Sequence, residues 1–220
     1  MMIDSEGFYE YELKAKTVEK IMTVIRNLKR RMGKLKNVME HPDYCSRCHP
    51  SEDVQLAQTR RHLEKAKEAL AEAGGVYQPS KAELAASAFD ENLSAIREIR
   101  YSLCGLRHAP EIEKHVITIE EDGPHRNGKR FQIANAISSI FDPESVVDTQ
   151  TFLEALRELH IGEWRRSYSA ERFRMHILDG VQWEVEFRFS NGFKPVKIHG
   201  CNVYPYNFDE FLEILGLDPL

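Results

Sequence analysis

The feature that most constrains the fold is the stretch VQWEVEFRFSNGFKPVKIHG, which runs from Val181 to Gly200. Over its first nine positions polar residues alternate with apolar ones, and the apolar ones are β-branched or aromatic. A period of two with such residues is typical of a strand that buries one face. Asn191 and Gly192 follow, and Asn-Gly is the pair that two-residue hairpin turns prefer. The stretch therefore predicts a β-hairpin.

The turn also predicts the register of the two strands. A slip by one residue would move every apolar side chain to the wrong face, so the apolar pattern and the turn have to agree. They agree in one register, which also places polar residues opposite one another on the other face. The predicted pairs are Phe187–Val196, Val185–Ile198 and Trp183–Gly200 on the apolar face, and Glu186–Lys197, Glu184–His199 and Gln182–Cys201 on the polar face.

A third strand is predicted before this hairpin, from about Arg172, with a turn at Asp179 and Gly180. A three-residue loop with Gly180 in the left-handed region buries more apolar surface than a two-residue loop. It aligns Phe173 with Val185, Met175 with Trp183 and Ile177 with Val181. On the outer face it sets Arg172 beside Glu186, Arg174 beside Glu184 and His176 beside Gln182. The whole is an antiparallel β-meander from about Arg172 to His199.

Further elements complete this C-terminal half. Residues 116–121 and 130–134 predict a weaker hairpin. A helix is expected over residues 149–160, and a last helix after Asn207, because apolar residues recur in both at helical spacing. These apolar residues are Phe152, Leu153, Leu156 and Leu159 in the first, and Phe208, Phe211, Leu212 and Leu215 in the second. A sheet with helices on one face is the expected arrangement.

The N-terminal half predicts long helices. Residues 18–39 carry apolar side chains at spacings of three and four, which is an a/d seam, and Pro42 follows it. A second helix is expected from the N-cap residue Ser51 to the glycine stop at Gly74, and a third from the capping box at Ser80 to about Leu103. Short connections favour an antiparallel helical hairpin with the third helix packed on it. The seam could pack within one chain or form a homodimer.

These elements place the chain in the α+β class. We expect a helical, coiled-coil-like domain over residues 1–108, built as a helical hairpin or three-helix unit. An α+β domain with an antiparallel sheet is expected over residues 109–220. At 220 residues the chain is long enough to bury a core without disulfide bonds.

Charge is concentrated in the first predicted helix. Between Leu13 and Lys36 there are nine basic residues and one acid, a net of +8, so the other residues carry −5 − 8 = −13. A solvated helix face is one explanation. The other is an anionic partner, a nucleic acid or an acidic protein surface, which we favour as the function. The residues expected to bind it are Arg26, Lys29, Arg30, Arg31, Lys34 and Lys36.

A second candidate site is the stretch HPDYCSRCHP, residues 41–50. Cys45 and Cys48 have the Cys-x-x-Cys spacing of a zinc site, but no second such pair follows. The further ligands would be His41 and His49, with His62 or Cys104 as alternatives. A polar connection between helices and a redox dithiol are the other interpretations, and a thioredoxin-like site would need a preceding strand. If zinc is bound with an open position, the alternative function is a metal-dependent hydrolase or nuclease.

A third candidate is the polar face of the sheet, where Glu184, His176 and His199 could form a catalytic or metal constellation. Cross-strand polar ladders of this kind commonly only stabilise a wet sheet face. The sequence contains no phosphate-binding glycine loop, nucleophile elbow or His-Glu-x-x-His motif, so no enzyme class is indicated.

The segment from residue 178 onward resembles the C-terminal part of a family of small bacterial proteins to which no activity is attached. The matching elements are Asp-Gly-x-x-Trp at residues 179–183, the Asn-Gly turn, Gly-x-Asn-x-Tyr-Pro at residues 200–205, and Asn-Phe-Asp at residues 207–209. The resemblance covers about forty residues clearly. It implies a bacterial origin and no mechanism. With no apolar run near the ~18 residues of a membrane span, we expect a cytoplasmic protein whose four cysteines are thiols or ligands.

Overall fold

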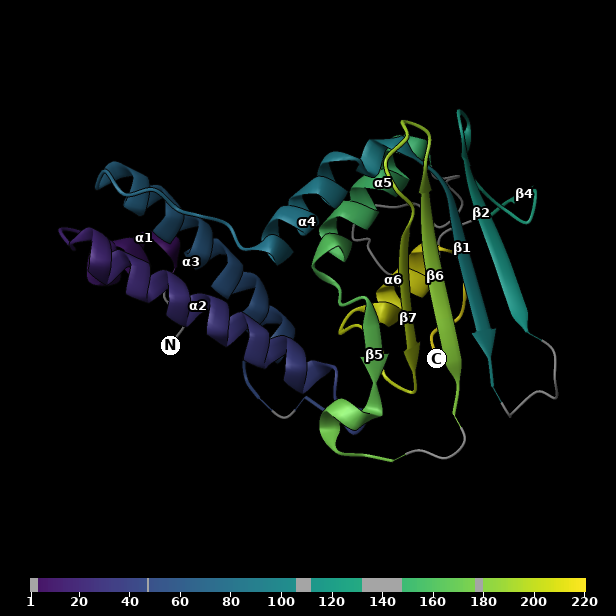
Figure 1. Ribbon diagram of the computed structural model, residues 1–220, viewed down its shortest axis with the longest axis horizontal. Coiled ribbons are helices and arrows are strands. Elements are labelled where there is room, and N and C mark those ends of the chain that lie inside the picture. The colour runs from purple at the N-terminus through teal and green to yellow at the C-terminus, as the bar shows by residue number, and fades with distance from the viewer. Residues whose placement is uncertain (1–3, 47, 106–111, 132–147, 177–179) are drawn as a thin grey trace. The chain divides into compact units, whose positions relative to one another are not determined.

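The computed structural model describes residues 4–46, 48–105, 112–131, 148–176 and 180–220, and Figure 1 shows its helices and strands. The chain is α+β and divides into two compact units, Met1–Pro79 and Ser80–Leu220. The division lies ahead of helix α4 (Lys81–Glu91), whereas the sequence analysis placed it after residue 108. The reason is that residues 96–104 form a strand of the sheet instead of a helix.

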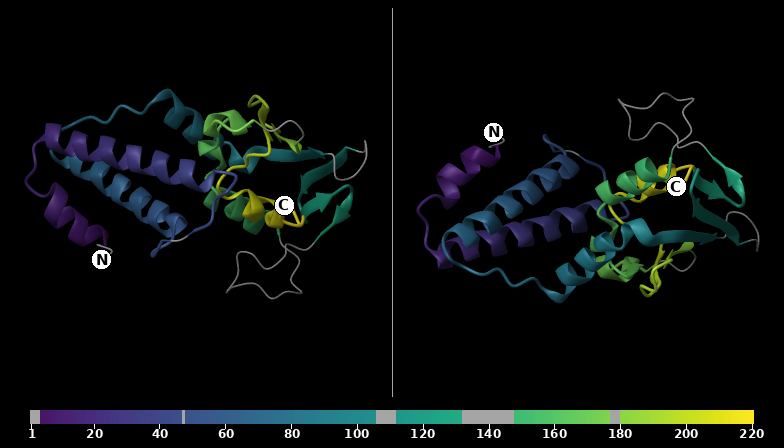
Figure 2. Two further views of the ribbon diagram at one scale, coloured as in Figure 1. Left: turned by 90° about the horizontal axis from the view of Figure 1, so that it is seen from below. Right: turned by 90° about the horizontal axis from the view of Figure 1, so that it is seen from above.

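The first unit is a helical hairpin. A short α1 (Ser5–Phe8) and a π-helical turn (Tyr9–Leu13) precede the two long helices α2 (Val18–Met39) and α3 (Glu52–Glu72). The long helices run side by side in all views (Figures 1 and 2). The seam of α2 packs within the chain, in a cluster with the apolar side of α3. That cluster includes Ile21, Ile25 and Leu28 from α2, and Leu63, Ala66 and Leu70 from α3.

The ends of α3 follow the predicted capping signals. Ser51 takes the extended N-cap conformation, and Gly74 stops the helix with a φ of 78° in the left-handed region. The amide of Gly75 donates to the Leu70 carbonyl at 2.8 Å, and the amide of Gly74 donates to the Ala71 carbonyl at 2.9 Å. These two bonds form a Schellman motif, which satisfies carbonyls that the helix end would otherwise leave unpaired.

The second unit is built on a seven-stranded mixed sheet with the order β4-β3-β2-β1-β6-β7-β5. The β5–β7 pair is parallel and the other neighbouring pairs are antiparallel. The strands are β1 (Ile96–Cys104), β2 (Glu113–Glu120), β3 (Gly123–Arg126), β4 (Lys129–Arg130), β5 (Ser167–Ser169), β6 (Gln182–Phe189) and β7 (Val196–Cys201).

The predicted register of the β6–β7 hairpin is confirmed at every pair. Phe187 lies opposite Val196, Val185 opposite Ile198, and Gln182 opposite Cys201, with the intermediate pairs also in place. Gly192 has a φ of 83°, which explains why the turn requires a glycine there.

The third helix was predicted too long. Its capping box at Ser80 is present, but α4 ends at Glu91, and after a 3₁₀ turn (Leu93–Ala95) the chain enters β1. Ile96, Ile99 and Leu103 fit helical spacing, yet Ile99, Tyr101 and Leu103 also alternate. β1 pairs with β2 on one side and with β6 on the other, so both of its backbone edges are hydrogen-bonded. That tertiary pairing overrides the helical pattern.

The predicted third strand of the meander was wrong, because β1 takes the place beside β6. Residues Ala170–Phe173 form a 3₁₀ turn that ends at Arg174 in the left-handed region, with a φ of 58°. The predicted cross-strand neighbours Arg172, Arg174 and His176 are therefore replaced. Residues of β1, namely Arg100, Ser102 and Cys104, lie opposite Glu186, Glu184 and Gln182. The predicted partners Ile177 and Asp179 lie outside the described residues.

The weaker hairpin was half right. The strand over residues 116–120 is present as part of β2, but its hairpin partner is β3. Of the later predicted segment, Arg130 lies in β4, which follows a turn at Asn127 and Gly128 and pairs with β3 instead of β2. Residues 132–134 of the prediction lie outside the described residues.

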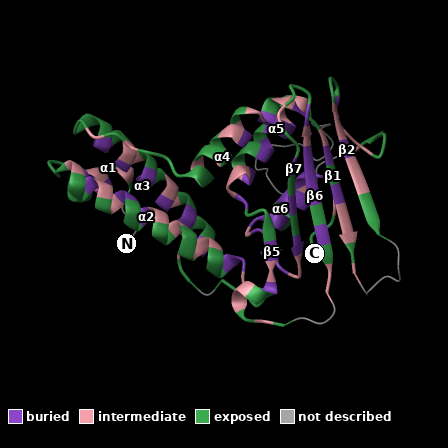
Figure 3. Cartoon of the chain, in the orientation of Figure 1, coloured by how far each residue is buried: buried purple, intermediate pink, exposed green. Residues whose placement is uncertain are grey.

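Helices cover the inner face of the sheet, as expected. The predicted helices are confirmed as α5 (Thr149–Glu158) and α6 (Phe208–Ile214), and Figure 3 shows buried residues on α5 and α6 and along the strands. Phe152 and Phe211 from these helices share one core with Val185 and Phe187 of β6. Within the described ranges, none of the helices is long and apolar enough to cross a membrane.

Candidate functional site on the exposed face of α2

The basic residues of α2 face away from α3, because the apolar stripe of α2 packs against α3. Thr17 caps the helix by accepting from the Lys20 amide, and the buried stripe then faces α3. With about 100° of rotation per residue, positions four apart shift by only about 40° and advance about 6 Å along the axis. Residues 26, 30 and 34 therefore form a line on the side opposite the stripe.

Three of the six predicted binding residues make up this line. Arg26, Arg30 and Lys34 are all exposed. We call these three residues the basic line. The guanidinium of Arg30 donates to the amide oxygen of Asn27, a neutral partner that leaves its charge in place. In the part of the chain that the structure describes, no carboxylate pairs with any residue of the basic line.

The other three predicted residues lie on the flanks of the helix. The ammonium of Lys29 donates to the Tyr77 hydroxyl at 3.0 Å and lies 5.6 Å from the centre of that ring. Arg31 donates to the side-chain oxygen of Gln55 in α3 at 3.3 Å, and Lys36 is partly buried. The sequence predicted all six as one set, and the structure separates them into an outward line and a group with intramolecular contacts.

The Cys-His stretch forms the connection between α2 and α3, held by the buried Glu52. The hydroxyls of Tyr44 and Ser46 donate to one Glu52 oxygen at 2.8 and 2.7 Å. These hydrogen bonds, with that of Ser46 first, lower the pKa of Glu52 to about 2. The carboxylate in turn raises the pKa of the Cys48 thiol through a hydrogen bond and its charge. A raised thiol pKa reduces the thiolate that metal binding and nucleophilic attack require.

The predicted zinc ligands are not assembled in this connection. Cys45 and Cys48 are exposed free thiols, and the His41 ring nitrogen Nδ1 accepts from the Asp43 amide at 3.1 Å. Among the described residues, no three of Cys45, Cys48, His41 and His49 bring their ligand atoms within 4.8 Å of one another. Zinc binding here stays a prediction.

A different group of metal-ligand side chains lies at the β2–β3 turn. The His125 ring nitrogens lie 3.8 Å from a Glu120 oxygen and 3.7 Å from an Asp122 oxygen. Arg130 also lies 3.8 Å from that Asp122 oxygen, so an ion pair already partly neutralises the group. This group was not predicted, although the spacing Glu-x-Asp-x-x-His around a turn is a signal for it in the sequence.

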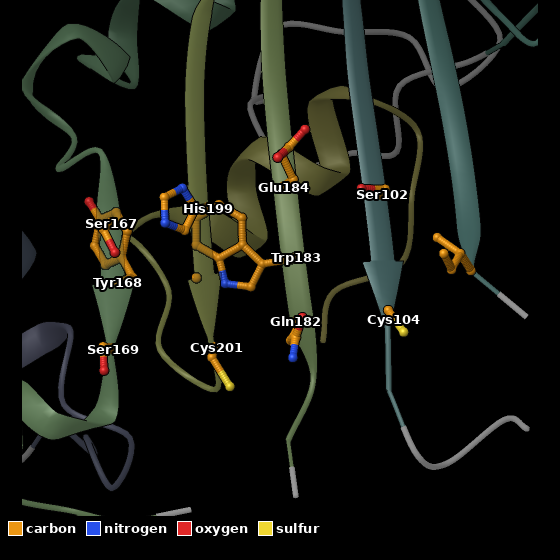
Figure 4. A pocket seen from close by; sticks show the side chains of 12 residues that line it. Ser102, Cys104, Ser167, Tyr168, Ser169, Gln182, Trp183, Glu184, His199 and Cys201 are labelled. Carbon is orange, nitrogen blue, oxygen red and sulfur yellow. The ribbon is translucent and has the colours of Figure 1, made fainter. Parts of the chain in front are cut away.

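The polar face of the sheet carries a shallow hollow of about 480 Å³, shown in Figure 4. Two rows of polar side chains cross it from β1 through β6 and β7 to β5. The rows are Ser102, Glu184, His199 and Ser167, and below them Cys104, Gln182, Cys201 and Ser169. The predicted neighbours Glu184 and His199 are thus adjacent, but His176 is not part of the hollow.

The chemistry of these rows does not favour catalysis. The carboxylate of Glu184 pairs with the Lys197 ammonium at 3.3 Å instead of with His199. Within the described residues, no hydrogen bond joins His199 to Glu184 or Ser167. These residues therefore do not form a triad in which a carboxylate orients a histidine base beside a serine nucleophile.

The motif residues of the C-terminal segment have structural roles. The indole of Trp183 lies directly over Gly200, where a Cβ would come within 2.5 Å of the indole nitrogen, and this nitrogen donates to the Val203 carbonyl at 2.9 Å. Tyr204 stacks on Trp183 with ring centres 5.9 Å apart. Asn202, with a φ of 53°, accepts from the Val181 amide at 2.8 Å. The segment therefore fixes the start of β6 against the end of β7.

Asn207 extends this scaffold to the helices. Its side-chain oxygen accepts from the Trp164 indole at 3.0 Å, and its side-chain nitrogen donates to the Leu159 carbonyl at 2.8 Å. Both bonds are buried, so the loss of either would leave a buried polar group without a partner.

Comparisons with known proteins found no match to a family model, to a curated protein or to a solved structure. The resemblance of the C-terminal segment to a bacterial family remains a prediction.

Proposed function

We propose that this chain is a non-enzymatic binding or regulatory protein of the bacterial cytoplasm, which docks an anionic macromolecule through α2. The basic line carries the proposal, because Arg26, Arg30 and Lys34 hold three exposed charges at one-turn intervals. Fixed charges of one sign attract an oppositely charged partner over roughly a Debye length of 8 to 10 Å.

The net charges of the two units support an anionic partner for the helical unit. Residues 1–79 hold 14 basic and 12 acidic residues, a net of +2, and residues 80–220 hold 16 basic and 23 acidic residues, a net of −7. Positive charge is thus concentrated in the helical unit of a protein that is acidic as a whole. Cytoplasmic location is proposed because all four cysteines are free thiols.

The test is charge reversal on the basic line. Arg26→Glu, Arg30→Glu and Lys34→Glu together change the net charge from −5 to −11, because each reversal subtracts two. We expect wild-type protein to be retained on immobilised heparin at low salt and the triple variant to pass through. A matched control reverses Arg97, Lys129 and Lys194, exposed residues of the other unit, and has the same net charge.

Retention of the triple variant, or equal loss in the control, would contradict docking through α2. Circular dichroism of both variants checks that the helices are intact. The metal-dependent hydrolase or nuclease stays the alternative prediction. Its test is the zinc content of purified protein, which the alternative expects to be one ion per chain and to be lost in Cys45→Ser.

A further inference from the structure

Gly33 lies inside the C-terminal half of α2, where a glycine lowers helix stability and no contact within the described residues requires it. In a helix interior glycine is about 1 kcal/mol less favourable than alanine. Its φ is not in the left-handed region, and a Cβ added there would meet no atom within 4 Å. The fold would accept any ordinary helix-forming residue at this position. An unfilled surface position in a helix is useful where another molecule's backbone approaches closely.

The residues of the basic line lie near Gly33 on the helix surface. At about 100° per residue, Gly33 lies within about 20° of Arg26 and about 60° of Arg30 around the helix axis, and Lys34 is its next neighbour in the chain. Arg26 lies about 10 Å from Gly33 along the helix axis, since each residue advances the helix by about 1.5 Å. A phosphate backbone that passes over the glycine can therefore place successive phosphates beside the three cationic side chains.

The side chains of this face are those that contact phosphates. The exposed residues beside the basic line include Thr23 and Asn27. The Thr23 hydroxyl donates to the Glu19 carbonyl at 2.9 Å, and the Asn27 amide oxygen accepts from Arg30. Protein–protein interfaces are anchored by a core of buried apolar or aromatic side chains. Positions 23, 26, 27, 30, 33 and 34 hold no such residue, and Val38, one turn beyond Lys34, is a single exposed apolar side chain. Arginine, lysine and asparagine are among the usual donors to phosphate oxygens of nucleic acids.

The same face disfavours single strands. Proteins that bind single-stranded nucleic acids stack bases on aromatic side chains, and α2 contains no aromatic residue. A duplex keeps its bases stacked inside and presents its phosphate backbone, so it needs no such platform.

We propose that the anionic partner is a nucleic-acid duplex, whose phosphate backbone seats on Gly33 between the side chains of the basic line. This inference rests on the proposed function and names its partner. Binding is independent of base sequence, because backbone contacts carry no sequence information. With three phosphates neutralised, the logarithm of the association constant falls with the logarithm of salt concentration at a slope of roughly −2.7.

The experiment measures fluorescence anisotropy of three labelled probes with the full chain, starting at roughly 50 mM salt. The probes are a mixed-sequence duplex of about 20 base pairs, one of its single strands, and poly-glutamate. The variant Gly33→Leu blocks the seat, yet leucine favours the helix more than glycine does. We expect it to weaken duplex binding about tenfold or more. The control Ala57→Leu places the same side chain on an exposed position of α3 and should bind as wild type.

A second variant, Arg30→Gln, should reduce the salt slope by about 0.9 for the duplex. Duplex binding by Gly33→Leu at wild-type strength would refute the seat. If poly-glutamate binds, the duplex does not, and Arg30→Gln weakens poly-glutamate binding, the nucleic-acid partner is refuted. The proposed docking of an anionic partner through α2 would then still hold. Tighter binding of the single strand than of the duplex would likewise overturn the choice of a duplex. If none of the probes binds, both proposals fail.

Discussion

Asp90, near the end of α4, has a carboxyl group in an environment that disfavours its charge. Its oxygen Oδ1 is buried and has no hydrogen-bond partner among the described residues. Burial, with Glu163 as the next cause, raises the pKa of Asp90 to about 6 from 3.8, although Arg157 acts in the opposite direction. We predict that Asp90→Asn stabilises the second unit at neutral pH.

The magnitude follows from the difference between the two pKa values. About 6 minus 3.8 is roughly 2 pKa units, which corresponds to about 3 kcal/mol at full effect. The side chain is only partly buried, so solvent screening reduces the expected gain to about 1 to 2 kcal/mol. The folded pKa lies above the unfolded one, so the ionised carboxylate destabilises the fold above pH 6, and the penalty disappears below about pH 4. The gain from Asp90→Asn should therefore be present at pH 7 and absent at pH 4.

Urea unfolding followed by tryptophan fluorescence measures this gain directly. Both tryptophans, Trp164 and Trp183, lie in the second unit and are buried, so their emission reports on the unfolding of that unit. Other carboxylates titrate over the same range, so the quantity to compare is the difference between variant and wild type at each pH. A difference that does not change between pH 4 and pH 7, or a variant that is less stable at pH 7, would refute the reasoning.

Three further predictions concern stability. Gly200→Ala should cost about 1 to 3 kcal/mol in the same fluorescence assay, because the new methyl group overlaps the buried Trp183 indole; an unchanged midpoint would contradict the packing. Asp148→Ala should cost about 1 kcal/mol, because the Asp148 carboxylate accepts from the Thr151 amide at 2.9 Å and caps α5, whereas Asp148→Asn should retain most of the cap. Gly33→Ala should raise the stability of the helical unit by about 1 kcal/mol in thermal unfolding followed by circular dichroism, and a loss there would mean that the position is packed.

Local signals in the sequence determined much of the fold. The Asn191-Gly192 turn and the alternation before it were sufficient for the register of β6 and β7, because both depend on neighbouring residues and on one buried face. The start of α4 after Ser80 was equally local, since its capping box is formed by residues within one turn of the helix.

Long-range pairing decided what the sequence could not. Residues 96–104 fit a helix and a strand about equally, and they form β1 because β2 and β6 are available on either side of them. For the same reason the segment after Arg172 does not pair with β6. Each strand has two neighbours in a sheet, and those of β6 are β1 and β7.

The candidate site shows the same division. The excess of basic residues in α2 was visible in the sequence, and so was their presence on a helix with one apolar stripe. Which of them face outward was decided by tertiary contacts, because Tyr77 and Gln55 draw Lys29 and Arg31 toward the hairpin. Arg26, Arg30 and Lys34, with Gly33 among them, are identified as an exposed face by the packing of α3 on the opposite side of α2.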